Sequence, residues 1–282
     1  MIAENYSLTG KQILHFETFG FLVRRNVFSA EEVAKINGEF DRRRASILAE
    51  IDPEEKRTFT QWPTRNPENP FTASLLDDPR IYVPSEQLVG EDSIPVQSHC
   101  NSYGKSSGWH VDTFDRRLCV IKNLLYLQPT TADRGALRVI PGSHRSPLSE
   151  DLRNMDLYGF HDDTSPFLNA SGMRGEDIPC YIFESEPGDV ITFNELTWHA
   201  AFGGYRDRRT CTFNFYRNPR VPEEIESMRK EVEYTSNSNN RLGTVGLQYH
   251  PWWLKNPDHN PRRARWINWL KEWGFVDAYD NK

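Results

Sequence analysis

The spacing of apolar residues changes twice along the chain, and these changes predict its architecture. Near the N-terminus, Val33, Ile36 and Phe40 recur at helical spacing, which indicates an amphipathic helix lying on a larger body. Between residues 94 and 217 the apolar positions form short runs or alternate with polar ones, which is typical of β-strands. Helical spacing returns over residues 222–274. The pattern therefore predicts a mainly β core with helical flanks.

Capping signals predict where the first helices begin. Thr9 with Gln12, and Ser29 with Glu32, have the spacing of a capping box, in which two side chains satisfy free amides at a helix start. Residues 19–23 lie between the two predicted helices and read as a short strand. The sequence thus predicts the order helix, strand, helix at the N-terminus.

The segment after the second helix gives weaker signals. Charge and proline dominate residues 51–69, which predicts irregular surface structure. Residues 71–88 predict two short helices, interrupted by Pro79 and Pro84. These elements complete a helical flank over residues 9–90.

Two strand patterns are prominent in the β region. Residues 118–128 are almost continuously apolar and predict a buried central strand. Residues 96–101 alternate instead, so that Gln97, His99 and Asn101 form one strongly polar face, which is either exposed or lines a site. Several short strands flanked by helices at both ends predict a jelly-roll-type barrel.

Composition limits the partners that we expect. The net charge of −6 gives no electrostatic reason to expect nucleic acid or an anionic membrane. No apolar run approaches the roughly 20 residues of a membrane span, and the first residues do not resemble a secretory signal. The four cysteines are far apart, so reduced thiols are expected. We expect one cytoplasmic domain over residues 1–282, with its barrel core at about 94–217.

A short motif in the β region indicates a metal site. His110 and Asp112 are two positions apart, and such residues of a strand point to the same face. His199, far downstream, is the candidate third ligand. Two imidazoles and one carboxylate leave three positions open on an octahedral metal, which suits non-haem Fe(II) oxygenases. A His-x-Asp triplet arises easily by chance, so the surrounding sequence decides its meaning.

The surroundings supply a polar strand face and a long connection. Because His99 and Asn101 lie beside the metal motif, we favour a pocket-lining role for at least one of them over an exposed face. Residues 143–179 are polar, and a connection of this length in a compact domain is commonly a lid or binding loop. His144 and His161 lie in this connection and are interpreted as loop residues rather than metal ligands.

Four segments, taken in order, resemble the phytanoyl-CoA dioxygenase family, whose members are Fe(II)/2-oxoglutarate oxygenases built on a double-stranded β-helix. Each segment is short, but the ordered set is specific, and it spans roughly residues 14–217. The segments are residues 16–23 with 27–33, residues 109–112, residues 135–145 with their Pro-Gly-Ser-His sequence, and residues 187–199 with the arginine pair that follows.

The resemblance implies a jelly-roll or cupin-like barrel and chemistry with dioxygen. His110, Asp112 and His199 would hold Fe(II), and 2-oxoglutarate and dioxygen would take the open positions. Oxidation of 2-oxoglutarate to succinate and carbon dioxide would accompany hydroxylation of an unactivated carbon in a small molecule. The presence of Asp112 argues against halogenation, because related halogenases carry a small residue there. Desaturation, cyclisation and epimerisation would use the same site.

The resemblance also implies a cation for the distal carboxylate of 2-oxoglutarate. Arg208 is preferred because its strand face continues through polar residues, and Arg209 is the alternative because one residue of slippage exchanges the faces. Tyr126 and Asn101 are further candidate contacts, although an ordinary core tyrosine is an equal reading of Tyr126. Relatives often carry a hydroxyl where this chain has Ala201, so the contacts differ in detail from the family pattern.

The sequence does not predict which small molecule is the substrate. His99 and Trp198 are candidate substrate contacts. Residues 51–90, 143–179 and the aromatic cluster at 249–253 are expected to shape the pocket, although packing against the barrel is the commoner use of such a cluster.

Two other classes of protein remain as alternatives. One is a non-catalytic jelly-roll module that binds a metabolite, and the other is a cupin-type metalloenzyme that does not use 2-oxoglutarate. A binding module needs neither intact metal ligands nor a positioned arginine, and the second class does not need the arginine. The arginine pair after His199 therefore favours the oxygenase. Nothing in the sequence indicates the oligomeric state.

Overall fold

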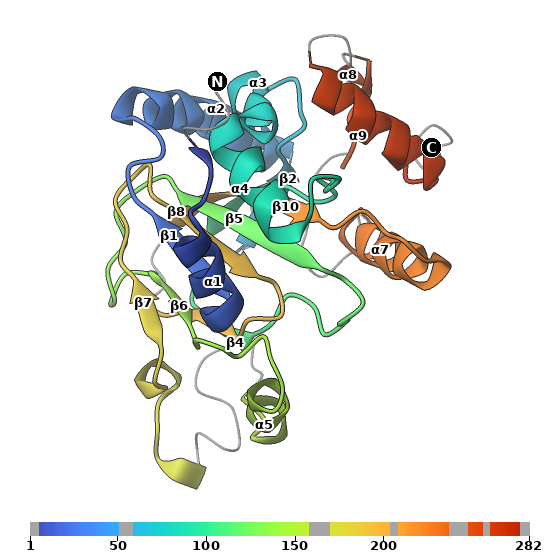
Figure 1. The fold of residues 1–282 in the computed structure, drawn as a ribbon. Helices are drawn as coiled ribbons and strands as arrows, with labels where there is room; N and C mark the ends of the chain where they lie inside the picture. Colours follow the sequence, from blue (N-terminus) through green and yellow to red (C-terminus); the bar gives the residue numbers. More distant parts are fainter. Residues whose placement is uncertain are drawn as a thin grey trace.

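Two antiparallel β-sheets lie at the centre of the chain, with helices around them (Figure 1). The larger sheet contains, in spatial order, β1 (Phe21–Arg24), β8 (Val190–Asn194), β5 (Val120–Tyr126), β10 (Arg208–Tyr216), β3 (His99–Tyr103) and β2 (Phe59–Pro63). The smaller sheet contains β4 (Ser107–His110), β9 (His199–Ala201), β6 (Leu137–Val139) and β7 (Tyr181–Phe183). This computed structural model describes residues 6–50, 59–157, 170–203, 208–236, 248–255 and 260–276.

The two sheets face each other across an apolar layer. One buried cluster combines residues of the larger sheet with residues of the smaller one: Phe21, Leu124, Tyr126, Ile191 and Phe193 with Leu137, Val139 and Phe183. The predicted mainly β core with helical flanks is therefore confirmed as two antiparallel sheets with helices outside them.

The opposite face of the larger sheet is covered by helices. The principal buried cluster joins Ile121 and Leu125 of β5 to residues of several helices, including Phe40 and Trp266. Strand β5 is covered on both faces, as its continuous apolar run predicts, because Leu124 and Tyr126 pack toward the smaller sheet and Ile121 and Leu125 pack toward the helices. The helices with members in this cluster are α1 (Gly10–Phe19), α2 (Ala30–Glu50), α4 (Pro79–Val89), α7 (Pro222–Ser236), α8 (Pro251–Leu254) and α9 (Pro261–Glu272).

Both predicted capping boxes are present. The Gln12 N–H donates to Thr9 Oγ1, and the Thr9 N–H donates to Gln12 Oε1, at the start of α1. Ser29 and Glu32 make the same reciprocal pair at the start of α2. The predicted order of helix, strand and helix at the N-terminus is therefore confirmed.

The prediction of irregular surface structure over residues 51–69 is wrong for residues 59–63, which form β2, whereas residues 64–69 lie outside helices and strands. Strand β2 pairs with β3 at the edge of the larger sheet, and Trp62 within it is fully buried against Phe40. Residues 51–58 lie outside the described part of the chain. The charged residues and prolines around this strand predicted a loop, so Trp62 was not recognised as a buried strand residue.

The prediction that Pro84 interrupts a helix is also wrong. Short helix α3 (Pro70–Ser74) is followed by a 3₁₀ turn, η2 (Leu75–Asp77), and α4 then continues through Pro84. Proline cannot donate to the carbonyl four residues earlier, which belongs to Arg80. That carbonyl instead accepts a hydrogen bond from the guanidinium of Arg24. The side chain replaces the missing backbone donor, so the helix persists.

The long connection over residues 143–179 contains helix α5 (Leu148–Asn154) and a 3₁₀ turn, η3 (Gly175–Asp177). His144 lies in the turn before α5, and its ring nitrogen Nε2 is 3.2 Å from the backbone oxygen of Glu17. This contact agrees with its interpretation as a loop residue. His161 lies outside the described residues.

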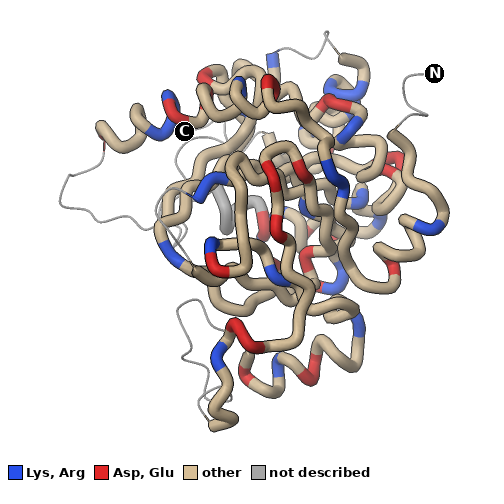
Figure 2. The backbone as a smooth tube through the Cα atoms, turned by 90° about the vertical axis from the view of Figure 1, so that its left-hand side faces the viewer, with Lys and Arg blue, Asp and Glu red and all other residues tan. Residues whose placement is uncertain are grey.

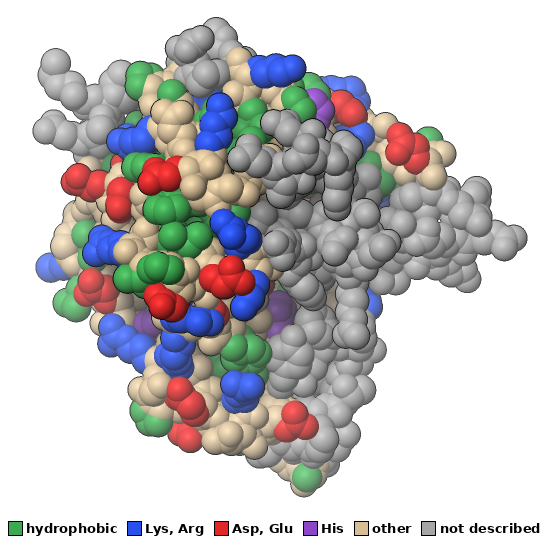
Figure 3. All heavy atoms as spheres, turned by 90° about the vertical axis from the view of Figure 1, so that its right-hand side faces the viewer, with side chains coloured by type: hydrophobic (Ala, Val, Ile, Leu, Met, Phe, Trp, Pro, Cys, Tyr) green, Lys and Arg blue, Asp and Glu red, His purple; other side chains and the backbone are tan. Residues whose placement is uncertain are grey.

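Basic and acidic residues alternate along the chain, as the colours of the backbone tube show in Figure 2. In the described part of the face in Figure 3, basic and acidic side chains are likewise interspersed. In the part of the chain that the structure describes, no helix is both long and apolar enough to cross a bilayer. All four cysteines are free thiols.

A buried arginine fastens the C-terminal segment to the sheet. Arg65 is fully buried and donates to the backbone oxygens of Pro95 and Val96, each at 2.7 Å, and of Gln248 at 3.0 Å. Its guanidinium also lies 4.6 Å from the ring centroid of Tyr249. The aromatic cluster at 249–253 therefore packs on the sheet, because Tyr249 is itself buried in the principal cluster.

We predict that Arg65→Leu destabilises the protein strongly. The carbonyls of Pro95 and Gln248 would lose a charged donor, whereas the Val96 carbonyl keeps the Gln248 amide and the Tyr249 hydroxyl. Each unsatisfied buried acceptor costs about 1–3 kcal/mol. We expect the free energy of unfolding, measured by chemical denaturation, to fall by about 3 kcal/mol or more. Arg42→Leu, at an exposed position of α2, is the matched control and should change it little. Equal effects of the two substitutions would contradict this role of Arg65.

Candidate metal centre

The pairing of two short strands brings the predicted histidine ligands together. His110 ends β4 and lies directly opposite His199, the first residue of β9. Opposite residues of antiparallel strands project to the same face, and the two imidazole centroids are 4.2 Å apart. The register is irregular between Ser107 and His110, and such bulges commonly redirect side chains beside a site.

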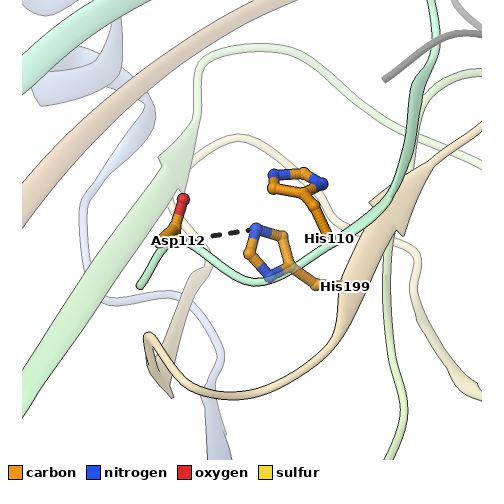
Figure 4. Close-up of side chains that lie close together, drawn as sticks. All are labelled: His110, Asp112 and His199. Carbon is orange, nitrogen blue, oxygen red and sulfur yellow. Dashed lines mark ion pairs between the residues drawn. The ribbon is translucent and has the colours of Figure 1, made fainter. Parts of the chain in front are cut away.

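Asp112 joins the cluster from just beyond the end of β4. Its N–H donates to the backbone oxygen of Glu195 at 3.0 Å, which ties this part of the chain to the turn before β9. Asp112 Oδ2 lies 3.6 Å from His199 Nε2. The three side chains point toward one another (Figure 4), and their candidate ligand atoms all lie within 4.8 Å. Among the described residues, no other such group was found.

Hydrogen bonds orient both imidazoles in the same way. His110 Nδ1 lies 2.7 Å from the backbone oxygen of Gly108, and His199 Nδ1 lies 2.9 Å from that of Thr197. A carbonyl can only accept, so Nδ1 carries the proton in each ring and Nε2 is the basic nitrogen. This tautomer, set by a carbonyl two residues earlier, is typical of metal-binding histidines.

Electrostatics keep the three groups in the protonation states that bind metals. Burial lowers the pKa of His199 to about 3 and also lowers the pKa of His110, so both rings are neutral near pH 7. Burial alone would raise the pKa of Asp112, but the positive charge of Lys122 and its hydrogen bond to the carboxylate hold that pKa well below its usual value. Two neutral imidazoles and one carboxylate form a complete donor set for a divalent metal.

Lys122 and Glu195 lie beside this cluster, and the sequence did not single them out. Lys122 Nζ donates to Asp112 Oδ2 at 2.7 Å and lies 3.7 Å from Glu195 Oε1. Glu195 Oε1 also accepts a hydrogen bond from Asn214 Nδ2 at 2.7 Å. Burial raises the pKa of the Glu195 carboxyl to about 8. The available signal was a single charge within the otherwise apolar run of residues 118–128.

Arg208 and Arg209 point to opposite sides of β10. Arg208 is buried between the sheets, with its guanidinium 4.4 Å from the ring centroid of Tyr103. Arg209 points to the helical side, where it forms an ion pair with Asp41 at 2.9 Å and lies over the ring of Phe40. This register agrees with the predicted choice of Arg208 as the inward-facing arginine.

The partners of Arg208 are weak. Its Nη1 lies 3.4 Å from the Gly135 oxygen and its Nη2 lies 3.4 Å from Ser107 Oγ, while its buried Nε has no hydrogen-bond partner among the described residues. Within the same residues it forms no ion pair with a carboxylate. A buried guanidinium with neutral partners only is a costly arrangement that favours binding of an anion.

Tyr126 and Asn101 lie on the same inward face. Tyr126 is opposite Thr210 in the β5–β10 pair, and its hydroxyl donates to the Gly135 oxygen at 3.1 Å. Asn101 is opposite Thr210 in the β3–β10 pair, and its side-chain amide donates to Thr210 Oγ1 at 3.3 Å. Both residues are near Arg208 along the strands, and their roles as contacts of a cosubstrate stay predictions.

His99 is buried, so the alternative of an exposed strand face is wrong for this residue. Its Nε2 lies 3.0 Å from Oε1 of Gln248, which belongs to the C-terminal segment. Burial, with the nearby charges of Arg65 and Lys122, lowers the pKa of His99 to about 3, so the ring is neutral. Gln248 is a residue that the sequence analysis missed, because nothing in the sequence brings residues 99 and 248 together.

Trp198 points away from the candidate ligands. It precedes His199 in the chain and packs in a separate buried cluster with Trp109, Val111 and Phe202. Adjacent residues of an extended chain project to opposite faces. The Trp198 side chain therefore lies on the opposite face of the chain from His199. The structure does not bring Trp198 to the candidate ligands, and its contact with a substrate stays a prediction.

Comparison with protein families matches residues 16–210 to "Phytanoyl-CoA dioxygenase (PhyH)". This match covers more than half of the 282 residues. The chain belongs to the PhyH family. The resemblance carried by the His-x-Asp motif, the Pro-Gly-Ser-His sequence and the second histidine is thereby confirmed.

Curated relatives of this PhyH chain include ectoine dioxygenases. The protein from Bordetella bronchiseptica is 26% identical over 225 residues, which are 69% of this chain and 70% of the relative. The protein from Sphingopyxis alaskensis is 26% identical over 227 residues, with coverage of 70% and 71%.

Solved structures share the fold. EctD from S. alaskensis, solved with 2-oxoglutarate and 5-hydroxyectoine, superposes with a TM-score of 0.57 at 21% identity, over 76% of this chain and 78% of EctD. HygX from Streptomyces hygroscopicus, solved with nickel and 2-oxoglutarate, gives a TM-score of 0.56 at 23% identity, over 75% of this chain and 87% of HygX. At 21% and 23% identity, these similarities show only that the fold is shared.

The absence of a side chain at Gly135 leaves room for Arg208. Substitution of Gly135 by a larger residue should therefore displace the arginine. Gly135 has a φ of +77°, and an added Cβ would lie 2.7 Å from Arg208 Cδ. We predict that Gly135→Ala lowers the free energy of unfolding by about 1–3 kcal/mol, because an unfavourable backbone angle is combined with this contact. Chemical denaturation measures the change.

Gly10→Ala is the control for this prediction. Gly10 begins α1, and an added Cβ would meet no atom within 4 Å. Alanine favours helices over glycine, so we expect Gly10→Ala to be neutral or slightly stabilising. A Gly135 variant as stable as the Gly10 variant would show that Arg208 does not pack closely on residue 135.

Proposed function

We propose that this PhyH protein is an Fe(II)- and 2-oxoglutarate-dependent oxygenase that hydroxylates an unactivated carbon of a small molecule. We propose further that its two sheets form a double-stranded β-helix within a single domain over residues 1–282. The observation that carries the functional proposal is the combination, on facing strands, of a His110–Asp112–His199 cluster with the buried, weakly partnered guanidinium of Arg208.

The donor set fits Fe(II). His110 and His199 present Nε2 as the basic nitrogen, and Asp112 is ionised, so the protein supplies two nitrogens and one oxygen. When bound, the iron would supply the activation of dioxygen with oxidation of 2-oxoglutarate to succinate and carbon dioxide. The chain holds these three side chains in place. The carbonyls of Gly108 and Thr197 orient the two imidazoles.

Arg208 would bind the distal carboxylate of 2-oxoglutarate. A guanidinium matches a carboxylate with two parallel hydrogen bonds, and in a site shielded from water this pairing is strong. Tyr103 covers one face of the guanidinium and leaves the edge for the anion. Tyr126 and Asn101 would lie along the same strands and complete the pocket for the cosubstrate.

Substrate contacts are proposed from the polar part of the inward face. His99 is neutral and paired with Gln248, so the two side chains offer one donor and one acceptor rather than a charge. The ectoine dioxygenases act on a small molecule by name, and we propose a small molecule here also. The two remaining alternatives, a binding module and a metalloenzyme that does not use 2-oxoglutarate, become outcomes of the first experiment.

The first experiment measures succinate from 2-oxoglutarate with Fe(II), ascorbate and dioxygen. We predict that the protein releases succinate and that alanine at His110, Asp112 or His199 abolishes release while the far-ultraviolet circular dichroism is unchanged. His15→Ala, at an exposed histidine of α1, is the control and should retain release. Metal binding without succinate would favour a different metalloenzyme, and no metal binding would favour a binding module.

The second experiment compares the two neighbouring arginines. Removing one partner of a buried charge pair costs about 3–5 kcal/mol, so Arg208→Ala should weaken the apparent affinity for 2-oxoglutarate by about two to four decades. Arg208→Lys should recover only part of this loss, because lysine lacks the planar fork. Arg209→Ala should be mild, since Arg209 pairs with Asp41 on the helical side.

The results for the two arginines distinguish a wrong strand register from a wrong cosubstrate. A large effect at Arg209 with little effect at Arg208 would mean that the register of β10 is shifted by one residue. No effect at either arginine would remove the support for 2-oxoglutarate as the cosubstrate. The measurement in each case is the concentration of 2-oxoglutarate that gives half-maximal succinate release.

A further inference from the structure

A single charged side chain interrupts the apolar strand at the centre of the larger sheet. Lys122 lies in the middle of β5, between Ile121 and Asn123, and its side chain is only 17% exposed. Burying an ammonium group is costly, and an ion pair rarely stabilises a fold more than well-packed apolar side chains would. The position of this lysine therefore calls for a reason other than stability.

The lysine is directed at the candidate metal ligand. Its Nζ lies 2.7 Å from Asp112 Oδ2, which is the same oxygen that lies 3.6 Å from His199 Nε2. The ring of Phe193 is near both groups, because its centroid lies 5.8 Å from Lys122 Nζ and 4.9 Å from the ring centroid of His199. Lys122 thus approaches the carboxylate on the side that faces the imidazoles.

Two neighbouring strands flank Lys122 in the sheet. Lys122 is opposite Phe193 of β8 and opposite Asn214 of β10. Asn214 donates to Glu195, and the Glu195 backbone oxygen in turn accepts the N–H of Asp112. The lysine and its carboxylate are therefore fixed to the same framework, so that the direction of the Asp112 side chain is coupled to the position of the Lys122 ammonium.

We propose that Lys122 is a positioning residue that orients the Asp112 carboxylate for metal binding. This inference rests on the proposed function, because it requires Asp112 to be a metal ligand. Groups that hydrogen-bond a ligating carboxylate or histidine typically change metal affinity by about 10–100-fold when they are removed. Lys122 is expected to act on metal affinity in this way and not to bind 2-oxoglutarate, which is the part proposed for Arg208.

The experiment measures metal affinity without turnover. Ni(II) and, under anaerobic conditions, Fe(II) are titrated into wild type, Lys122→Met, Lys122→Gln and Lys122→Arg by calorimetry in the absence of 2-oxoglutarate. We expect about 10–100-fold weaker binding for the methionine and glutamine variants. Lys122→Arg keeps a cation at the carboxylate and should recover much of the loss. Lys35→Met, at an exposed lysine paired with Glu31, should bind as wild type does.

A second measurement separates this role from direct binding of an anion. At saturating metal, the 2-oxoglutarate concentration for half-maximal succinate release should change less than threefold in the Lys122 variants. Unchanged metal affinity with a large rise in that concentration would overturn the proposal in favour of a lysine that binds 2-oxoglutarate. Unchanged values of both would assign Lys122 to the fold alone.

Folding failure is handled by the choice of variants. If Lys122→Met does not fold, Lys122→Gln and Lys122→Arg decide the question by the same two measurements. A wild-type protein that binds neither Ni(II) nor Fe(II) would overturn the proposed function, and the role of Lys122 with it. A wild-type protein that binds metal while all lysine variants bind equally well would overturn the role of Lys122 and leave the proposed function intact.

Discussion

Buried charge is the constraint on which the site depends. The face of the larger sheet that looks toward the smaller one carries two cations, Lys122 and Arg208, beside a largely apolar layer. A charge in such a place needs an opposite charge or several hydrogen bonds. Lys122 meets this need with Asp112, whereas Arg208 has an aromatic ring and two long contacts with neutral oxygens. Lys122 is therefore paired with a carboxylate of the chain, whereas the arrangement around Arg208 favours the binding of an anion.

The alternation of β10 separates the two tasks of the larger sheet. Arg208, Thr210 and their successors face the smaller sheet, while Arg209 and Cys211 face the helices. Because neighbouring residues point to opposite sides, the strand can present polar groups to the site and apolar groups to the helical layer in the same stretch. A shift of one residue would reverse both faces at once, so packing by the helices also determines which arginine is inside.

Local signals predicted much of this arrangement, and long-range contacts were harder to predict. Capping boxes and the apolar run of β5 depend on residues close in sequence, and both were confirmed. The pairing of His110 with His199 was inferred from residue types. Strand β2 was missed because its place at the sheet edge depends on β3, and Gln248 was missed because its contact with His99 joins distant segments. The alternation of side chains along β9 places Trp198 in a separate buried cluster with Trp109 and Phe202, so its contact with a substrate stays a prediction.

The C-terminal segment connects a buried arginine that stabilises the fold to His99 on the inward face of the larger sheet. Arg65 binds the backbone oxygen of Gln248 and the oxygens of Pro95 and Val96, and the side chain of Gln248 also donates to the Val96 oxygen. These contacts fix Gln248 at the position where its Oε1 meets His99. A residue far from the metal cluster thus sets the hydrogen bonding of a histidine on the inward face. Changes in this segment can alter the hydrogen bonding of His99, which we propose as a substrate contact, while His110, Asp112 and His199 keep their own supports from backbone carbonyls and Lys122.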